Sequence, residues 1–244
     1  MNRDSNLYTF LFATIMVLVV ATVLAFTSQS LKDLQKENVR KEKMQNILST
    51  VGIVTDRDGA EELFNKYIES QLAIQNDGSI DASVDVFNNV KLSLELKKLP
   101  KEQNFPLYVA KIESKKYYII PIRGNGLWNA IYGYISIKED LNTIKGVVFD
   151  HIGETAGLGA EITQDWFIER FVDEKLFDIN NNLIGIKVSK TNNDPNNSDK
   201  NDHEVDAISG ATITGDGVTD MIIERLEHYI PYFNTLRSNK IALN

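Results

Sequence analysis

The feature that most constrains this chain is an uncharged apolar run near its N-terminus. Residues 7–26 read LYTFLFATIMVLVVATVLAF and contain no Asp, Glu, Lys or Arg. About 20 apolar residues are what a helix needs to cross the hydrocarbon core of a bilayer. A cleavable signal peptide is the alternative, but the run is longer than a typical signal core and no clear small-x-small cleavage site follows it. The run predicts a retained single-pass transmembrane helix, with residues 1–30 as the anchor.

A helical stalk is predicted directly after the anchor. Between residues 31 and 51 the apolar side chains fall roughly on one face of a helix, while Lys and Glu fill the other face. The apolar positions are Leu31, Leu34, Met44, Ile47, Leu48 and Val51. We assign residues 31–56 to the stalk and residues 57–244 to a globular domain. Because 43% of the chain is hydrophobic, a sizeable core is available to that domain.

The globular part mixes helices and hairpins. Helices are expected over residues 58–74 and 166–172, and residues 79–99 are irregular and partly extended. Strands are expected over residues 107–112, 117–122, 131–137, 143–149 and 183–188. Pro121 indicates an edge strand or a bulge, because Pro cannot donate to a ladder. The polar residues 191–202 predict a mobile loop. Together these patterns predict an α+β fold with antiparallel hairpins, not alternating βαβ units.

Composition excludes several kinds of chemistry. The chain has no cysteine, which excludes disulfides, thiolate catalysis and Cys-ligated iron–sulfur clusters. Three histidines give little material for a metal site, so no metal is expected. A net charge of −8 argues against nucleic acid as a partner. The GxGxxG and GxxxxGK[ST] fingerprints are absent, and no hydrolase constellation stands out. Any redox chemistry would therefore come from an organic cofactor.

The stretch DAISGATIT, residues 206–214, is the main candidate for a binding site. Gly210 allows a sharp turn or the close approach of a ligand. Helical spacing from Asp216 onward predicts a helix, with Thr214 or Asp216 as its N-cap. Its apolar positions are Val218, Ile222, Leu226, Tyr229 and Ile230. The Thr212 hydroxyl then lies near a helix N-terminus, which favours a phosphate. These residues alone leave two interpretations open: a phosphate-binding turn that includes an attachment point, or an ordinary turn capping a surface helix.

The motif Asp206-x-x-Ser209-Gly210-Ala211-Thr212 resembles the flavinylation motif of FMN-binding domains in bacterial sodium-pumping and related redox complexes. In that family a dedicated flavin transferase joins the FMN phosphate to the last Thr of the motif as a phosphoester. The resemblance therefore implies one covalent FMN per chain, attached to Thr212. It also implies that Asp206, Ser209, Gly210 and Ala211 shape the turn around the phosphate.

Two glycine-containing loops extend the resemblance. Gly124-x-Gly126-Leu127-Trp128 matches the family's Gly-x-Gly-Leu-Trp loop. Glu154-Thr155-Ala156-Gly157-Leu158-Gly159 matches Glu-Thr-Pro-Gly-Leu-Gly, with Ala156 where Pro is usual. Taken alone, the two loops leave two interpretations open: glycines that let backbone N–H groups approach a ligand, or a hairpin with Trp128 folded onto the core and a glycine-rich connection with Glu154 in solvent. The resemblance implies that both approach the flavin through Gly126, Leu127, Trp128, Glu154, Thr155, Gly157, Leu158 and Gly159.

Among these candidates we favour Thr155 and Leu158, because they lie inside the glycine-framed turn. Glu154 could accept a hydrogen bond from a ribityl hydroxyl, but it is the weaker candidate. A carboxylate buried beside a negatively charged reduced flavin is costly unless a partner compensates for it.

The stalk segment KDLQKENVRKEKMQNILSTVGI, residues 32–53, resembles the segment after the anchor in the NqrC family of sodium-translocating NADH:quinone oxidoreductases. The resemblance spans nearly the whole chain. It implies an electron-relay subunit within a complex that passes electrons from NADH to quinone, with the other pump subunits and a flavin transferase as partners. The uncharged helix need not carry the sodium path. The equivalent flavoprotein of the related ferredoxin:NAD oxidoreductase (its G component), or a membrane-anchored flavoprotein without pump function, are the alternatives.

Charge and resemblance disagree about the side of the membrane on which the domain lies. Lys32, Lys36, Arg40, Lys41 and Lys43 follow the anchor, and this excess of basic residues favours a cytoplasmic domain. The resemblance implies the bacterial inner membrane with the domain on the periplasmic side, where the flavin transferase works. We expect the periplasmic side, because the attachment site and the transferase must share a compartment.

Overall fold

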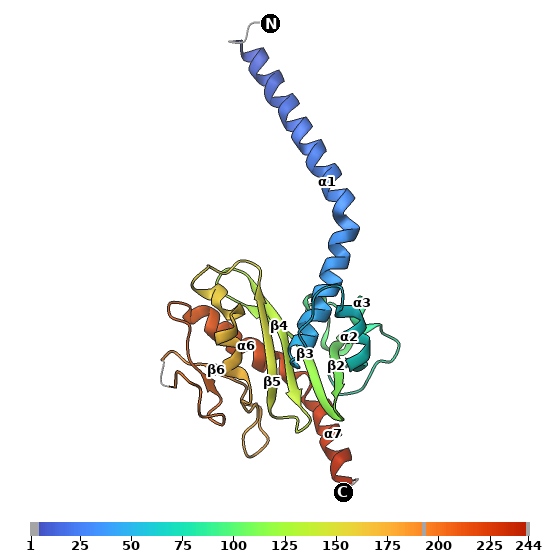
Figure 1. Cartoon of the computed structure of the whole chain (residues 1–244), viewed down its shortest axis with the longest axis vertical. Helices are drawn as coiled ribbons and strands as arrows, with labels where there is room; N and C mark the ends of the chain where they lie inside the picture. The colour runs from blue at the N-terminus through green and yellow to red at the C-terminus, as the bar shows by residue number, and fades with distance from the viewer. Residues whose placement is uncertain (1–4, 192–193, 243–244) are drawn as a thin grey trace. The chain divides into compact units, whose positions relative to one another are not determined.

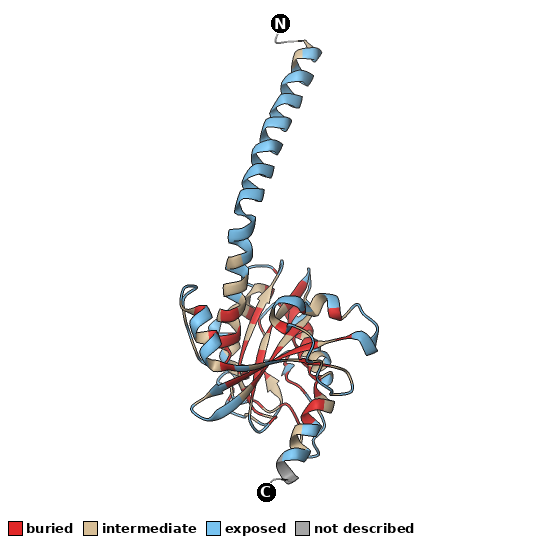
Figure 2. Ribbon diagram, turned by 90° about the vertical axis from the view of Figure 1, so that its right-hand side faces the viewer, coloured by how far each residue is buried: buried red, intermediate tan, exposed pale blue. Residues whose placement is uncertain are grey.

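The computed structural model describes residues 5–191 and 194–242 and divides into two compact units, Met1–Lys43 and Met44–Asn244. Helix α1 (Asn6–Ser49) makes up the described part of the first unit and contributes its last turns to the second (Figure 1). Residues 9–36 are exposed throughout, as the pale blue ribbon in Figure 2 shows. By length and composition α1 can cross a membrane. The assignment of residues 1–30 to the anchor, 31–56 to the stalk and 57–244 to the globular domain stays a prediction.

The second unit is built on a five-stranded antiparallel sheet with the strand order β1-β2-β3-β4-β5 (Figure 1). The strands are β1 (Ile68–Ile74), β2 (Phe105–Ile112), β3 (Lys115–Asn125), β4 (Ala130–Lys138) and β5 (Ile144–His151). The four strands expected between residues 107 and 149 are confirmed as β2 to β5. Their apolar residues alternate between faces, which is why both faces of the sheet can be covered.

Each face of the sheet carries its own hydrophobic cluster. On one face Tyr108 and Ile119 pack with the end of α1 and with helix α2 (Ala60–Tyr67). On the other face Leu107 and Ile120 pack with helix α6 (Thr212–Glu227) and with the start of helix α7 (Ile230–Ala242). In Figure 2 the buried parts of this unit, in red, run along the strands and along parts of its helices. The α+β architecture predicted from the sequence is therefore confirmed.

Short elements complete the domain. Before β2 they are α3 (Val86–Asn89), α4 (Leu92–Glu95) and the 3-10 helix η1 (Pro100–Glu102). After β5 they are η2 (Gly159–Thr163), α5 (Asp165–Ile168) and η3 (Glu169–Phe171), followed by the parallel pair β6 (Lys187–Val188) and β7 (Glu204–Val205). The short helix expected near residues 166–172 corresponds to α5 and η3.

Three local predictions were wrong. The helix expected over residues 58–74 ends at Tyr67, and the remainder is strand β1, paired with β2. Apolar residues at Ile68 and Leu72 fit a helix and a strand equally well, so pairing with β2 decides the outcome. Residues 183–188 form a strand only at Lys187–Val188. Pro121 does not mark an edge strand, because β3 is the central strand of the sheet.

Pro121 nevertheless lies beyond the end of the ladder between β2 and β3. The β2–β3 pairing ends at Tyr108 and Ile119, while Pro121 itself pairs with Tyr134 of β4. A missing N–H is tolerated there.

In the expected mobile segment 191–202, residues 192–193 lie outside the described residues. Asn197 in the same segment is buried and donates a hydrogen bond to Glu174 Oε1 at 2.7 Å.

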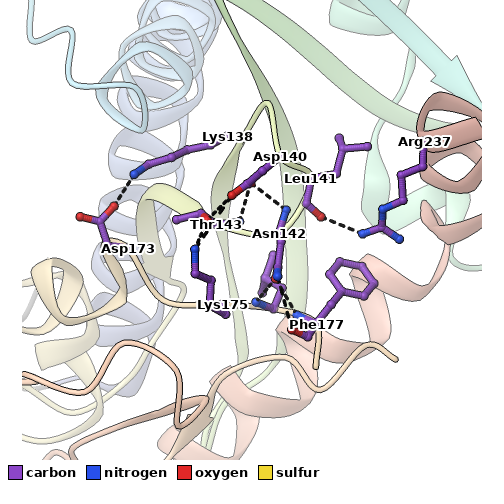
Figure 3. Close-up of polar contacts among 10 residues, drawn as sticks. Lys138, Asp140, Leu141, Asn142, Thr143, Asp173, Lys175, Phe177 and Arg237 are labelled. Atoms are coloured by element: carbon purple, nitrogen blue, oxygen red, sulfur yellow. Dashed lines mark hydrogen bonds and ion pairs between the residues drawn. The ribbon is translucent and has the colours of Figure 1, made fainter. Parts of the chain in front are cut away.

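A polar cluster fixes the turn between β4 and β5 (Figure 3). Asp140 Oδ1 accepts from the backbone N–H of Asn142 at 3.0 Å, and Asn142 Oδ1 accepts from the N–H of Phe177 at 2.8 Å. Arg237 of α7 donates to the carbonyl of Leu141 at 3.0 Å, and its guanidinium lies 4.5 Å from the centroid of the Phe177 ring. In an antiparallel pair this turn lies at the opposite end of β4 from the β3–β4 loop. The cluster therefore anchors the sheet at the end away from that loop.

Candidate functional site at the start of helix α6

Three loops that are distant in the sequence line one pocket with a volume of ≈ 230 Å³. The β3–β4 loop contributes Leu127, and the segment after β5 contributes Glu154, Thr155, Leu158 and Gly159. The turn before α6 contributes Gly210 and Ala211, and the first turn of α6 contributes Thr212, Ile213 and Thr214. The structure thus brings together the three segments that the sequence motifs single out.

Thr212 is the first residue of α6, and its side chain is exposed. The N-cap position is Ala211, and the first helical hydrogen bond runs from the N–H of Gly215 to the Ala211 carbonyl at 2.9 Å. The helix therefore begins earlier than expected, and the predicted caps Thr214 and Asp216 lie inside it. Backbone N–H groups in the first turn have no intrahelical acceptor, so they are available to a ligand beside Thr212.

The turn before Thr212 requires its glycine. Gly210 has φ +75°, a left-handed conformation that side chains disfavour. A Cβ atom built on Gly210 would also lie 2.8 Å from Leu158 Cδ2. Leu158, which is 40% exposed, therefore lies directly against the turn and contributes an apolar wall to the pocket.

Glu154 ties the three segments to one another. Its Oε1 accepts from the backbone N–H of Trp128 at 2.9 Å, and its Oε2 accepts from the hydroxyl of Thr214 at 2.6 Å. The N–H of Glu154 donates to Nδ1 of His151 at 3.1 Å. Only 7% of Glu154 is exposed. The carboxylate thus holds the β3–β4 loop and α6 in place around the pocket.

The carboxylate of Glu154 explains why two positions of the motif loops, 126 and 159, are occupied by glycine. A Cβ atom on Gly126 would lie 2.5 Å from Glu154 Oε1. A Cβ atom on Gly159 would overlap both Glu154 Oε2 and Thr214 Oγ1. Any side chain at either position would displace Glu154 from its hydrogen bonds, so close packing against the carboxylate requires both glycines.

The Glu154 carboxyl is held in its ionised form. Burial alone would raise its pKa, but hydrogen bonds from the Thr214 hydroxyl and from the N–H groups of Trp128, Asn129 and Leu127 outweigh burial. The net result is a pKa below the ordinary value of a glutamate. These donors are the compensation that a buried carboxylate needs.

Exposed apolar side chains surround the pocket. Leu127 is 48% exposed, Ile213 is 58% exposed and Trp128 is 69% exposed. The indole Nε1–H of Trp128 donates to Thr155 Oγ1 at 3.1 Å, which joins the two glycine-containing loops a second time. Gly157, with φ +75°, donates its N–H to Glu161 Oε1 at 3.1 Å and completes the turn next to Leu158.

Five of the candidate residues do not line the pocket, namely Gly126, Trp128, Gly157, Asp206 and Ser209. Asp206 is buried, and its carbonyl accepts from Arg170 Nη1 at 2.7 Å, so it anchors the start of the turn. Ser209 is exposed on the turn itself.

Sequence reasoning missed Arg170 and Ile213, and it missed the role of Thr214 as a partner of Glu154. Arg170 and Thr214 carry no local signal, because their partners lie far away along the chain, and no local pattern marks Ile213 as a pocket residue. In the described part of the chain, no group of three or more His, Asp or Glu could hold a metal ion.

Comparison with known proteins places these loops in a family. Residues 126–227 match the FMN-binding domain family. The NqrC subunit of the Na⁺-translocating NADH-quinone reductase of Vibrio anguillarum is 32% identical over 232 residues, with 89% of each chain covered. The same subunit from Neisseria meningitidis serogroup B is 30% identical over 97% of this chain and 96% of its own. The chain belongs to the NqrC family of Na⁺-translocating NADH-quinone reductase subunits.

Solved structures of NqrC proteins agree with this membership. The crystal structure of the protein from Parabacteroides distasonis has a TM-score of 0.73 and 33% identity, and covers 83% of this chain and 96% of its own. The structure of NqrC from Shewanella oneidensis has a TM-score of 0.66 and 26% identity, with 82% of this chain and 98% of its own covered. The NqrC family is therefore favoured over the equivalent flavoprotein of the ferredoxin:NAD oxidoreductase.

Proposed function

We propose that this chain relays electrons within a sodium-translocating NADH:quinone oxidoreductase through an FMN bound covalently to Thr212. The observation that carries the proposal is the position of Thr212, exposed at the first residue of α6 on the pocket formed by the three motif loops. Membership in the NqrC family, whose members are named as parts of that reductase, supports this role.

The residues present fit an FMN phosphate at Thr212. The N-terminus of α6 offers free N–H groups and the positive end of the helix dipole. Among the residues that the structure describes, the Thr212 hydroxyl has no hydrogen-bond partner, whereas the Thr214 hydroxyl is buried and bound to Glu154. Of the two threonines in this turn, Thr212 is therefore the one whose hydroxyl a flavin transferase can reach.

The walls of the pocket suit a flat, largely apolar ring. Leu127, Leu158 and Ile213 line it, and Trp128 lies beside it on the same loop as Leu127. The FMN would supply the ability to accept and release electrons. The protein's own residues hold the ring at one place, shield one side of it from water, and keep it from dissociating through the link at Thr212.

We further propose that α1 anchors the chain in the bacterial inner membrane, with the domain in the periplasm beside its flavin transferase and the other pump subunits. The basic residues after the anchor are weak evidence for a cytoplasmic domain, because long domains are translocated largely regardless of the flanking charge.

The proposal is tested by replacing hydroxyls in the turn. The chain is co-expressed with its flavin transferase, and covalent flavin is detected as a fluorescent band on a denaturing gel. We expect Thr212→Ala to lose the band. Ser209→Ala is the matched control, because Ser209 carries the other exposed hydroxyl of the turn, and this variant should keep the band. A band that persists in Thr212→Ala would overturn the assignment.

A further inference from the structure

Glu154 is a buried carboxylate that accepts its hydrogen bonds from neutral donors. Its oxygens accept from the Thr214 hydroxyl and the Trp128 N–H. In the part of the chain that the structure describes, no Lys, Arg or His forms an ion pair with it. Neutral donors stabilise a negative charge but do not cancel it. Glu154 therefore keeps a full negative charge at a site that is 7% exposed.

This charge lies in the wall of the pocket. Glu154 lines the pocket together with Leu127, Thr155 and Leu158, and the neighbouring rim is apolar. Charges in such surroundings are screened much less than charges in water. A ligand in the pocket therefore experiences the field of Glu154 at short range.

The hydrogen bonds alone do not require a charged residue at this position. A glutamine has the same shape. Its carbonyl oxygen can accept from the Trp128 N–H, and its NH₂ group can donate to the Thr214 hydroxyl oxygen. A neutral side chain could thus hold the three segments together, so Glu154→Gln removes the charge while it keeps the hydrogen-bond geometry.

A fixed negative charge raises the free energy of a neighbouring group that gains an electron. We propose that Glu154 sets the reduction potential of the flavin, its charge making the flavin harder to reduce. The inference rests on the proposed attachment of FMN at Thr212. In this role Glu154 is a positioning and electrostatic residue of the pocket wall, and it need not make a hydrogen bond to the flavin.

The test is a spectroelectrochemical titration of the full-length chain in detergent, loaded with FMN by its transferase. Glu154→Gln should raise the midpoint potential of the flavin clearly above that of the wild type. The matched control is Glu161→Gln, which neutralises a carboxylate of the same segment that lies outside the pocket lining. Its shift should be much smaller, because that charge does not face the ligand directly.

The outcomes separate the two proposals. Equal potentials in Glu154→Gln and wild type, with mass spectrometry showing FMN on Thr212 in both, would overturn the role of Glu154. Wild-type chain without FMN on Thr212 would instead overturn the proposed function. If Glu154→Gln does not load with FMN, Leu127→Lys decides, because it adds a cation to the same wall at a half-exposed position. That variant should also raise the potential, and no shift would contradict the proposal.

Discussion

The hydroxyl of Thr214 donates a 2.6 Å hydrogen bond to Oε2 of Glu154, a residue 60 positions earlier in the chain. Residues two apart on a helix point in different directions, so Thr212 and Thr214 do not share a face of α6. Thr214 faces the core and is bound to the protein, whereas Thr212 is exposed. The structure thereby distinguishes two threonines that look interchangeable in the sequence.

Thr214→Val should destabilise the protein by about 1–3 kcal/mol, because Glu154 Oε2 is left buried without its donor. The measurement is urea denaturation of the full-length chain in detergent. Thr212→Val is the matched control, since it removes an exposed hydroxyl from the same turn, and should change the free energy of unfolding by less than about 0.5 kcal/mol. Equal effects of the two changes would contradict the role of Thr214.

Gly159→Ala should destabilise the protein by about 1–3 kcal/mol, because the added methyl group overlaps Glu154 Oε2 and Thr214 Oγ1. The same change should lower the yield of covalent flavin when the transferase is present. Gly153→Ala is the control on the same loop, since its Cβ would meet nothing within 4 Å. The account fails here if both alanines are tolerated equally well in denaturation and in flavin loading.

Glu174 gives a prediction about pH. It is completely buried, and its Oε1 accepts from Asn197 Nδ2 at 2.7 Å. Burial raises its pKa from 4.5 to about 7, against the opposing effects of Asn197 and Lys200. The folded state then holds this proton more tightly than the unfolded state does. Its contribution to stability is full below pH 4.5 and is lost as the pH rises through about 7.

Glu174→Gln should therefore remove this part of the pH dependence while keeping the acceptor for Asn197. Relative to wild type, the variant should gain stability as the pH is raised from 4.5 to about 7, and the gain should level off above that range. Urea denaturation of both proteins across that range gives the difference in free energy of unfolding. A difference that does not change with pH would show that Glu174 titrates normally in the folded state.

The side of the membrane is tested by reporters fused after Asn244. An alkaline phosphatase fusion should be active and a green fluorescent protein fusion dark, because the domain is proposed to lie in the periplasm. Expression of both fusions is compared by immunoblot as a control. The reverse pattern of activities would place the domain in the cytoplasm, on the side that the basic residues after the anchor favour.

The strands β2 to β5 could be predicted because their apolar alternation is a local signal that the sheet preserves. Residues 68–74 could not be predicted, because their pattern fits a helix and a strand and only pairing with β2 decides between them. The start of α6 was also misplaced. Thr214 has the chemistry of an N-cap, but its hydroxyl is used in a distant contact with Glu154, and the cap position falls to Ala211.

The candidate site could be predicted as a set of loops but not as an arrangement. The motifs mark the segments around Gly126, Gly159 and Gly210, and a glycine in a loop predicts a turn or a close approach. The group that approaches Gly126 and Gly159 is the carboxylate of Glu154, a side chain of the protein itself. No sequence pattern shows that one carboxylate serves three segments, because that depends on how the sheet and α6 pack.

The covalent link at Thr212 is tested most directly by the mass of the tryptic peptide that carries the turn. Cleavage after Lys200 and Arg225 releases residues 201–225, which contain Ser209, Thr212 and Thr214. The account predicts that this peptide, from chain purified with its native transferase, is heavier by one FMN less one water. Fragment ions should place the addition on Thr212. An unmodified peptide, or an addition on Ser209 or Thr214, would contradict it.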